Sequence, residues 1–252
     1  MFDLAGRTAL VTGASGGFGG HFARVLARHG ARVALAARRA DRLDTLRQEI
    51  EEAGGTAFAV TMDVTEEESV IGAISDVERD FGGVDILVNN SGVGGGGPVL
   101  DTDAADWDGV LDVNLRGAFL VAREAGRAMR DAARSGSIIN TASIVGLRTA
   151  GGLAPYAASK AGLIHLTRSM GMELARYGIR VNALAPGYFP TDINDGFWDT
   201  PAGDAMLRRM PMRRLGRLHE LDGPLLLLAS DAGSYMTGSV IVVDGGHSVS
   251  PL

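Results

Sequence analysis

Short apolar runs alternate with longer segments of helical periodicity along most of the chain, and this alternation limits the possible fold more than any other feature. Most of the runs are apolar at consecutive positions, which is typical of strands in a parallel sheet covered on both faces. Strands that alternate with helices build an open, doubly wound α/β sheet. We therefore predict a seven-stranded parallel sheet with helices on both faces. Its predicted strands are Thr8–Val11, Arg32–Ala36, Thr56–Val60, Asp85–Val88, Ser137–Asn140, Arg180–Ala183 and Ser239–Val243.

Local signals predict where helices begin and end. After the first strand, apolar side chains recur at helical spacing, and Gly30 is the expected C-terminal stop. Thr65 and Glu68 form the pattern of a capping box, which predicts a second helix start. No long linker or repeat interrupts the pattern, so we expect residues 1–252 to form a single domain. The apolar positions of the first helix are Phe18, Phe22, Val25 and Leu26.

The segment Tyr188–Pro211 breaks the alternation and contains Pro190 and Pro201 as well as Pro211. It is longer than the usual connection between a strand and a helix, and such segments are often lids or binding loops. We expect a substrate-loop insertion over about residues 188–211. Its length alone fits a packed surface excursion equally well.

Composition excludes several classes of protein. The chain has 24 Lys+Arg against 30 Asp+Glu, a net charge of −6, whereas a nucleic-acid binder normally has a basic excess. Cysteine is absent, and the five histidines lack metal-ligand spacing, so we expect no metal site. The longest apolar stretches are far below the roughly 18 residues of a membrane span, and the N-terminus lacks a signal-peptide pattern. We expect a soluble cytoplasmic protein.

A glycine-rich loop, Thr12–Gly19, follows the first predicted strand and opens the first predicted helix. Gly13 permits the sharp turn, and Gly17 and Gly19 would let a pyrophosphate approach the backbone amides at the helix N-terminus. A glycine run by itself can be a mere turn. Between a strand and a helix it indicates a dinucleotide site.

The end of the second predicted strand bears on the choice of cofactor. An acidic residue there would bind the free ribose hydroxyl of NAD, but this chain has Ala37, Arg38 and Arg39. Two guanidinium groups suit the 2′-phosphate of NADP better. The alternative is that both arginines are solvated at a helix start.

Tyr156 and Lys160 are four residues apart, so on a helix they share one face. The reference pKa of tyrosine, about 10, is too high for efficient proton transfer near neutrality. A cation about 4 Å away contributes roughly 4 kcal/mol at an effective dielectric of 20, which would lower that pKa by about two to three units. A lone pair of this kind is usually a surface pair. Ser143, at the end of a predicted strand, makes an active site the more specific interpretation.

These motifs occur in one order along the chain and together closely resemble the short-chain dehydrogenase/reductase family, in its NADP-dependent branch. The resemblance spans Gly6 to Gly246 and implies a single NAD(P)-binding Rossmann-type domain. The motifs are Gly13, Gly17 and Gly19, Asn89-Asn90-Ser91-Gly92, Asn114, Ser143, Tyr156 with Lys160, and Pro186-Gly187.

The resemblance implies four catalytic roles. Ser143 would hold the substrate oxygen, and Tyr156 would act as general acid/base. Lys160 would bind the nicotinamide ribose and lower the pKa of Tyr156, and Asn114 would anchor a water in a proton relay. The implied cofactor contacts are Gly13, Ser15, Gly17, Phe18, Gly19, Arg38, Arg39, Asp63, Val64, Asn90, Gly92, Tyr156, Lys160, Pro186, Gly187 and Thr191.

Two positions depart from the family pattern. Ser91 stands where alanine is commonest, which we expect to be tolerated because both residues are small. Pro224 lies early in a helix expected from His219. Proline is acceptable in a first turn and damaging deeper inside a helix, so it puts that helix start in doubt.

We expect an NADP(H)-dependent oxidoreductase that interconverts a small-molecule carbonyl and alcohol, and family likeness implies a homotetramer. The alternatives are an NAD-dependent sugar-acid or polyol dehydrogenase and a 3-oxoacyl-thioester reductase. A dinucleotide-binding scaffold without turnover would not need all four catalytic residues. Three segments should select the substrate: Gly94–Gly97, Ile144–Leu153 and Tyr188–Pro211. Arg148 could bind an anionic substrate or simply face water.

Overall fold

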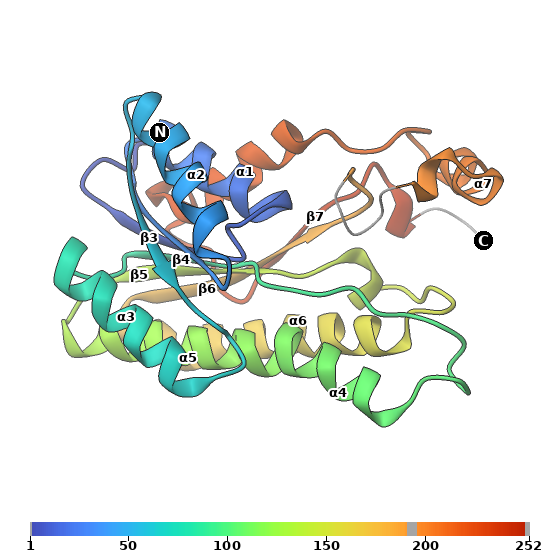
Figure 1. Ribbon diagram of the computed structural model, residues 1–252, viewed down its shortest axis with the longest axis horizontal. Coiled ribbons are helices and arrows are strands. Elements are labelled where there is room, and N and C mark those ends of the chain that lie inside the picture. The colour runs from blue at the N-terminus through green and yellow to red at the C-terminus, as the bar shows by residue number, and fades with distance from the viewer. Residues whose placement is uncertain (1, 191–195, 250–252) are drawn as a thin grey trace.

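The computed structural model describes residues 2–190 and 196–249 and contains a seven-stranded sheet in which every pairing is parallel. The strand order is β3-β2-β1-β4-β5-β6-β7, with helices above and below the sheet (Figure 1). The predicted fold class is confirmed. The strands are β1 Thr8–Thr12, β2 Arg32–Ala37, β3 Thr56–Thr61, β4 Ile86–Asn89, β5 Gly136–Thr141, β6 Ile179–Pro186 and β7 Val240–Val243.

The order of the strands reverses beside β1, which pairs with β2 on one side and with β4 on the other. The connections that leave β1 and β4 therefore diverge to opposite faces, and a crevice opens at their carboxyl ends. Each predicted strand is present, with ends that shift by up to three residues. This topology places the glycine-rich loop and the polar end of β4 at the same crevice.

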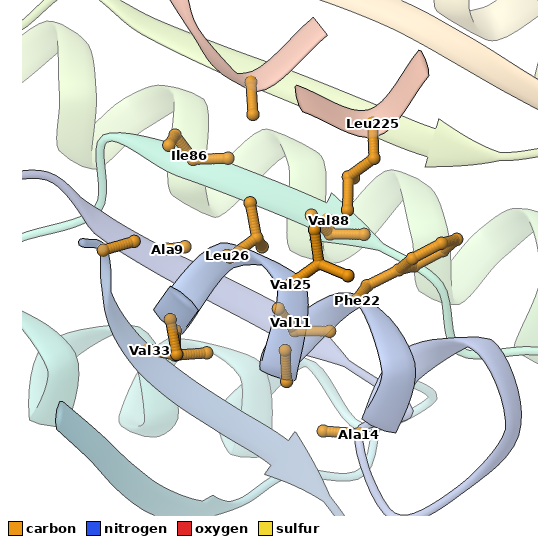
Figure 2. Close-up of a cluster of buried hydrophobic side chains, with 14 of the residues drawn as sticks. Ala9, Val11, Ala14, Phe22, Val25, Leu26, Val33, Ile86, Val88 and Leu225 are labelled. Carbon is orange, nitrogen blue, oxygen red and sulfur yellow. The ribbon is translucent and has the colours of Figure 1, made fainter. Parts of the chain in front are cut away.

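Two helical layers cover the sheet (Figure 1). On one face α1, α2 and α8 pack on the strands, and on the other α3, α5 and α6 do so. Phe22, Val25 and Leu26 of α1 are fully buried against strand residues and Leu225 of α8 (Figure 2). The helices are α1 Gly17–Arg28, α2 Ala40–Glu52, α3 Glu67–Phe81, α4 Ala104–Leu111, α5 Ala118–Asp131, α6 Ala154–Leu174, α7 Pro201–Arg209 and α8 Asp222–Ala229.

Gly30 follows α1 with a φ of 93°, a left-handed conformation that ends the helix as predicted. The predicted capping box is wrong, because α3 begins at Glu67 and the hydroxyl of Thr65 donates instead to the carboxylate of Asp63, at 2.8 Å. That carboxylate also accepts the Thr65 backbone N–H, so the threonine stabilises a turn before the helix.

Pro224 lies in the first turn of α8, where its missing N–H costs no helical hydrogen bond. The expected helix from His219 is divided into a 3₁₀ turn, Leu218–Leu221, and α8. Within residues 188–211 the described part contains a 3₁₀ turn, Phe197–Asp199, and α7, which lies apart from both helical layers (Figure 1). The sequence predicted an irregular segment here but not a helix.

Candidate active site

The side chain of Thr12 joins the carboxyl ends of β1 and β4. Its hydroxyl oxygen accepts hydrogen bonds from the backbone N–H groups of Asn90 and Ser91, each at 2.9 Å. The amide of Asn90 donates back to the Thr12 carbonyl at 3.1 Å. The two loops that leave the crevice are therefore fixed to each other before any ligand is bound.

The glycines of the glycine-rich loop are required for different structural reasons. Gly13 and Gly17 have φ values of 65° and 53°, which favour glycine, and a Cβ on Gly17 would meet nothing within 4 Å. A Cβ on Gly19 would lie 2.2 Å from the carbonyl oxygen of Gly13. We predicted that Gly19 serves the approach of a pyrophosphate, but close packing of α1 against the loop already requires it.

A cavity of about 870 Å³ opens at the carboxyl ends of the strands. Its wall contains all the predicted catalytic and cofactor residues except Asn114, Gly19 and Pro186, which are buried and do not line it, and Thr191, which is outside the described residues. The predicted residues on the wall are Gly13, Ser15, Gly17, Phe18, Arg38, Arg39, Asp63, Val64, Asn90, Gly92, Ser143, Tyr156, Lys160 and Gly187.

Arg38 and Arg39 lie on the cavity wall where β2 leads into α2. Arg39 donates to the hydroxyl of Ser15 in the glycine-rich loop, at 3.0 Å. The guanidinium of Arg38 is mostly exposed and lies 3.9 Å from the carboxylate of Asp63. Burial raises the pKa of that carboxyl, but hydrogen bonds from Thr65 and the charge of Arg38 outweigh it and lower the pKa. Two cations thus border the end of the cavity next to the glycine-rich loop.

Asn114 is fully buried in a π-helical turn, Asp112–Gly117, that connects α4 to α5. Its amide oxygen accepts from the backbone N–H of Val93 at 2.8 Å, and its amide nitrogen donates to the Val93 carbonyl at 3.0 Å and to the Ser159 hydroxyl at 3.2 Å. These bonds tie the loop after β4 to α6. π-helical turns are rare in proteins as a whole, but those that occur are often at functional sites.

Ser143, Tyr156 and Lys160 meet on one side of the cavity. Ser143 precedes a 3₁₀ turn after β5, and its hydroxyl accepts from the Val145 N–H at 3.3 Å. Tyr156 and Lys160 lie one turn apart on α6. The Lys160 ammonium is buried, donates to the Thr141 carbonyl at 2.8 Å and lies 5.6 Å from the centre of the Tyr156 ring. The predicted shared helix face is correct.

The electrostatics of this side differ from the prediction. Burial raises the pKa of the Tyr156 phenol, hydrogen bonding with Ser143 partly offsets it, and the neighbouring Tyr188 adds to the rise. Burial also lowers the pKa of Lys160, to about 8. The expected lowering of the Tyr156 pKa by Lys160 is therefore wrong for this structure, because desolvation of the phenol is the larger effect.

Several residues of the cavity wall were not among the individually predicted site residues. The Thr141 hydroxyl is buried and has no hydrogen-bond partner among the described residues. Tyr188, Phe189 and Leu153 also line the cavity, and the N–H of Gly97 donates to the Gly152 carbonyl at 2.8 Å. Each of the three segments expected to select the substrate reaches the cavity. The position of these segments in the sequence was therefore the signal that could have indicated Tyr188, Phe189 and Leu153. For Thr141 there was no signal beyond its place at the end of β5.

Within the described ranges, no group of histidine and carboxylate side chains has the arrangement of a metal site. No helix among those residues is long and apolar enough to cross a bilayer.

Comparison with known proteins assigns the family. A family model described as enoyl-(acyl carrier protein) reductase matches residues 13–248. The chain is 38% identical to gluconate 5-dehydrogenase of Gluconobacter oxydans, over 99% of this chain and 98% of the relative. It is 37% identical to 3-oxoacyl-(acyl-carrier-protein) reductase of Thermotoga maritima, over 96% and 98%.

Among solved structures, a gluconate 5-dehydrogenase from Burkholderia cenocepacia in complex with NADP and tartrate superimposes with a TM-score of 0.96. The two chains are 37% identical, and the match covers 99% of this chain and 98% of the other. This protein belongs to the short-chain dehydrogenase/reductase family, as its motifs predicted. It is an oxidoreductase that acts on CH–OH groups.

Lys160 is the only lysine in the chain, so its ionisation can be followed directly. Selective isotope labelling of lysine gives one side-chain resonance, which should titrate near pH 8 in the folded protein and near its ordinary 10.5 in urea. Between those values the unfolded chain binds more protons, so the free energy of unfolding should rise with pH from about 8 to 10. Lys160→Met should lack this rise. A single resonance titrating near 10.5 in the folded protein would contradict the assigned burial.

Proposed function

We propose that this protein is an NADP(H)-dependent oxidoreductase that interconverts a ketone or aldehyde and an alcohol, with Tyr156 as general acid/base. The observation that carries the proposal is that Ser143, Tyr156 and Lys160 lie on one side of a cavity whose other end is the glycine-rich loop and two arginines. The bound nicotinamide would supply or accept the hydride at the substrate carbon. The phenol of Tyr156 would give or take the proton at the substrate oxygen.

The residues present fit a dinucleotide phosphate. The cavity reaches the N-terminus of α1, whose backbone N–H groups favour an anion, and no side chain would meet a Cβ at Gly17. Lys160 uses one hydrogen bond on the Thr141 carbonyl and keeps further N–H groups for ribose hydroxyls. We assign these groups, together with Asn90 and Gly92, to cofactor binding.

The raised pKa keeps the Tyr156 phenol protonated at neutral pH, which is the form required to donate a proton during carbonyl reduction. Ser143 would hold the substrate oxygen and hydrogen-bond the phenol. For Asn114 we propose a positioning role, because its side-chain amide is already engaged by Val93 and Ser159. A relay water at Asn114 would then be held by its backbone, which lies in the π-helical turn.

We propose NADP(H) as the preferred cofactor. Ala37 places no carboxylate at the end of β2, and Arg38 and Arg39 lie on the cavity wall beside it. The Burkholderia cenocepacia neighbour was crystallised with NADP, which supports this choice. NAD(H) is the alternative, and it would bring no 2′-phosphate to these two guanidinium groups.

Two substrate classes follow from the relatives, a sugar acid and a 3-oxoacyl thioester. We favour a small hydroxy acid, because the cation Arg148 bonds to His247, whose ring packs against Tyr188 of the cavity wall, as argued below. We further propose that residues 1–252 act as one catalytic domain in the cytoplasm, with residues 188–211 as the substrate loop.

The first prediction tests the general acid/base. Tyr156→Phe removes the phenolic proton and keeps the ring, so turnover should fall by about 10²–10⁴-fold while NADPH binding persists. Tyr177→Phe is the matched control, because Tyr177 is on the surface in the 3₁₀ turn after α6. The measurement is steady-state oxidation of NADPH with a ketone panel. Turnover near that of the wild type in Tyr156→Phe would remove Tyr156 from this role.

Cofactor preference is tested at Arg38. A charge-assisted hydrogen bond is worth about 1.5–3 kcal/mol, so Arg38→Ala should weaken NADPH binding by roughly 10- to 150-fold and leave NADH nearly unchanged. Ala37→Asp should invert the preference, because it adds a ribose acceptor and repels the phosphate. Arg79→Ala is the control, since Arg79 on α3 pairs with Asp76 and Asp80. If the wild type has the higher kcat/KM with NADH, the assignment is wrong.

We also propose a homotetramer in which the helices around Asn114 and Tyr156 pair across a two-fold axis. Trp107 of α4 and Phe119 of α5 are large apolar side chains with more than a third of their surface exposed. Light scattering should report a tetramer at micromolar concentration, and Phe119→Glu should shift it toward smaller species because a charge would be buried. A wild-type monomer would refute the proposal.

A further inference from the structure

The ring of Tyr188 forms the cavity wall beside Tyr156. It follows Gly187 at the end of β6 and is half-buried. The ring contacts Trp198 edge-on, with centroids 5.3 Å apart, and also lies 5.3 Å from the imidazole of His247. Tyr188 and Tyr156 line the same cavity, and Tyr188 adds to the rise in the pKa of the Tyr156 phenol. Tyr188 thus marks the part of the cavity that a substrate would occupy beyond its reacting oxygen.

Arg148 belongs to the same group of side chains. It follows the 3₁₀ turn that begins after Ser143, and its guanidinium donates to the backbone carbonyl of His247. Burial raises the pKa of Tyr188, and the positive charge of Arg148 opposes that rise. Arg148 is not itself part of the cavity wall, and its link to the wall is His247, whose ring lies 5.3 Å from that of Tyr188.

The charge of Arg148 is not neutralised by a carboxylate in the part of the chain that the structure describes. The bond to the His247 carbonyl is the one side-chain bond that Arg148 makes there, whereas Arg214 is paired with Glu220 at 2.6 Å. The nearby Asp244 carboxylate is occupied by the backbone N–H groups of Gly246 and Ser248, at 2.9 and 2.6 Å. A half-buried guanidinium keeps donors for a further acceptor.

His247 supplies an independent observation. Its Nδ1 atom is buried and has no hydrogen-bond partner among the described residues. Burial lowers the pKa of this imidazole, and Arg148 lowers it further. A buried polar atom without a partner is rare in folded proteins and calls for an explanation. Here the imidazole belongs to the residue whose carbonyl accepts from Arg148, and among the described residues no carboxylate pairs with that cation.

We propose that Arg148 and the Tyr188 phenol form a carboxylate subsite that holds the anionic end of a hydroxy or oxo acid while its reacting carbon lies at Tyr156. The guanidinium would donate in a fork to the carboxylate, and the phenol would add a third hydrogen bond. The inference rests on the proposed function, since it assumes that Tyr156 is the reacting end of the cavity. It makes Arg148 a specificity-determining residue.

The test compares small hydroxy acids, D-gluconate among them, with their primary amides, and the corresponding oxo acids with theirs in the reverse direction. Each amide has nearly the shape of its acid but no charge, so the ratio of the two kcat/KM values measures recognition of the carboxylate. The wild type should prefer the acid. Arg148→Gln should reduce that preference by about 10- to 150-fold, mainly through KM, because the bond exists in both ground and transition states.

Two further variants separate the roles. Tyr188→Phe should reduce the preference by about 2- to 10-fold, the value of one neutral hydrogen bond. Arg176→Gln is the matched control, because Arg176 is exposed at the far end of α6 and packs on Tyr177, and it should leave the preference unchanged.

Each outcome decides the proposal. A wild type that turns over neutral ketones but shows no preference for acids overturns the carboxylate subsite and leaves the oxidoreductase proposal intact. An unchanged preference in Arg148→Gln does the same. A preference for 3-oxoacyl thioesters over acids would assign the other substrate class. If neither acids, amides nor thioesters are turned over with either cofactor, the proposed function fails and this inference fails with it.

Discussion

One buried hydroxyl, that of Thr12, holds together the two strands between which the sheet changes direction. By accepting the N–H groups of Asn90 and Ser91, it fixes the end of β4 against the end of β1. The loop after β4 then continues to Val93, where the Asn114 amide ties it to α6 through Ser159. Helix α6, which contains Tyr156 and Lys160, is thereby connected to β1, which leads into the glycine-rich loop. The relative position of the two ends of the cavity depends on this chain of hydrogen bonds.

The parts of the protein that were predictable from sequence are those encoded locally. Each strand is an apolar run, and the spacing of Tyr156 and Lys160 defines a helix face whatever the surroundings. The π-helical turn was not predictable, because it accompanies bonds between Asn114 and a loop more than twenty residues earlier in the chain. The shift in the pKa of Tyr156 was predicted with the wrong sign, because the spacing to Lys160 indicates a neighbouring charge whereas the burial of the phenol depends on the tertiary fold. The cluster of Arg148, Tyr188 and His247 requires that the ends of β5, β6 and β7 lie side by side.

The distribution of cationic side chains fits the chemistry of the site. The only lysine is buried at the cavity, and every other cationic side chain apart from histidine is an arginine. An ammonium can lose its proton when it is desolvated, whereas a guanidinium keeps its charge. Permanent charge is therefore placed at positions such as Arg38 and Arg148, where an anion would be met. The amine whose pKa is lowered by burial to about 8 lies next to the phenol to which we assign the proton transfer.

The packing of Gly19 bears on what a glycine-rich loop of this kind indicates about a protein. A side chain there would collide with the Gly13 carbonyl, in the protein without any ligand. A descendant that had lost all affinity for dinucleotides would still need that glycine in order to fold. Gly19 is thus explained by the packing of the loop and does not by itself indicate a bound dinucleotide. The Lys160 ammonium and the Tyr156 phenol differ from this glycine, because their burial opposes folding, and they are the groups to which we assign the chemistry.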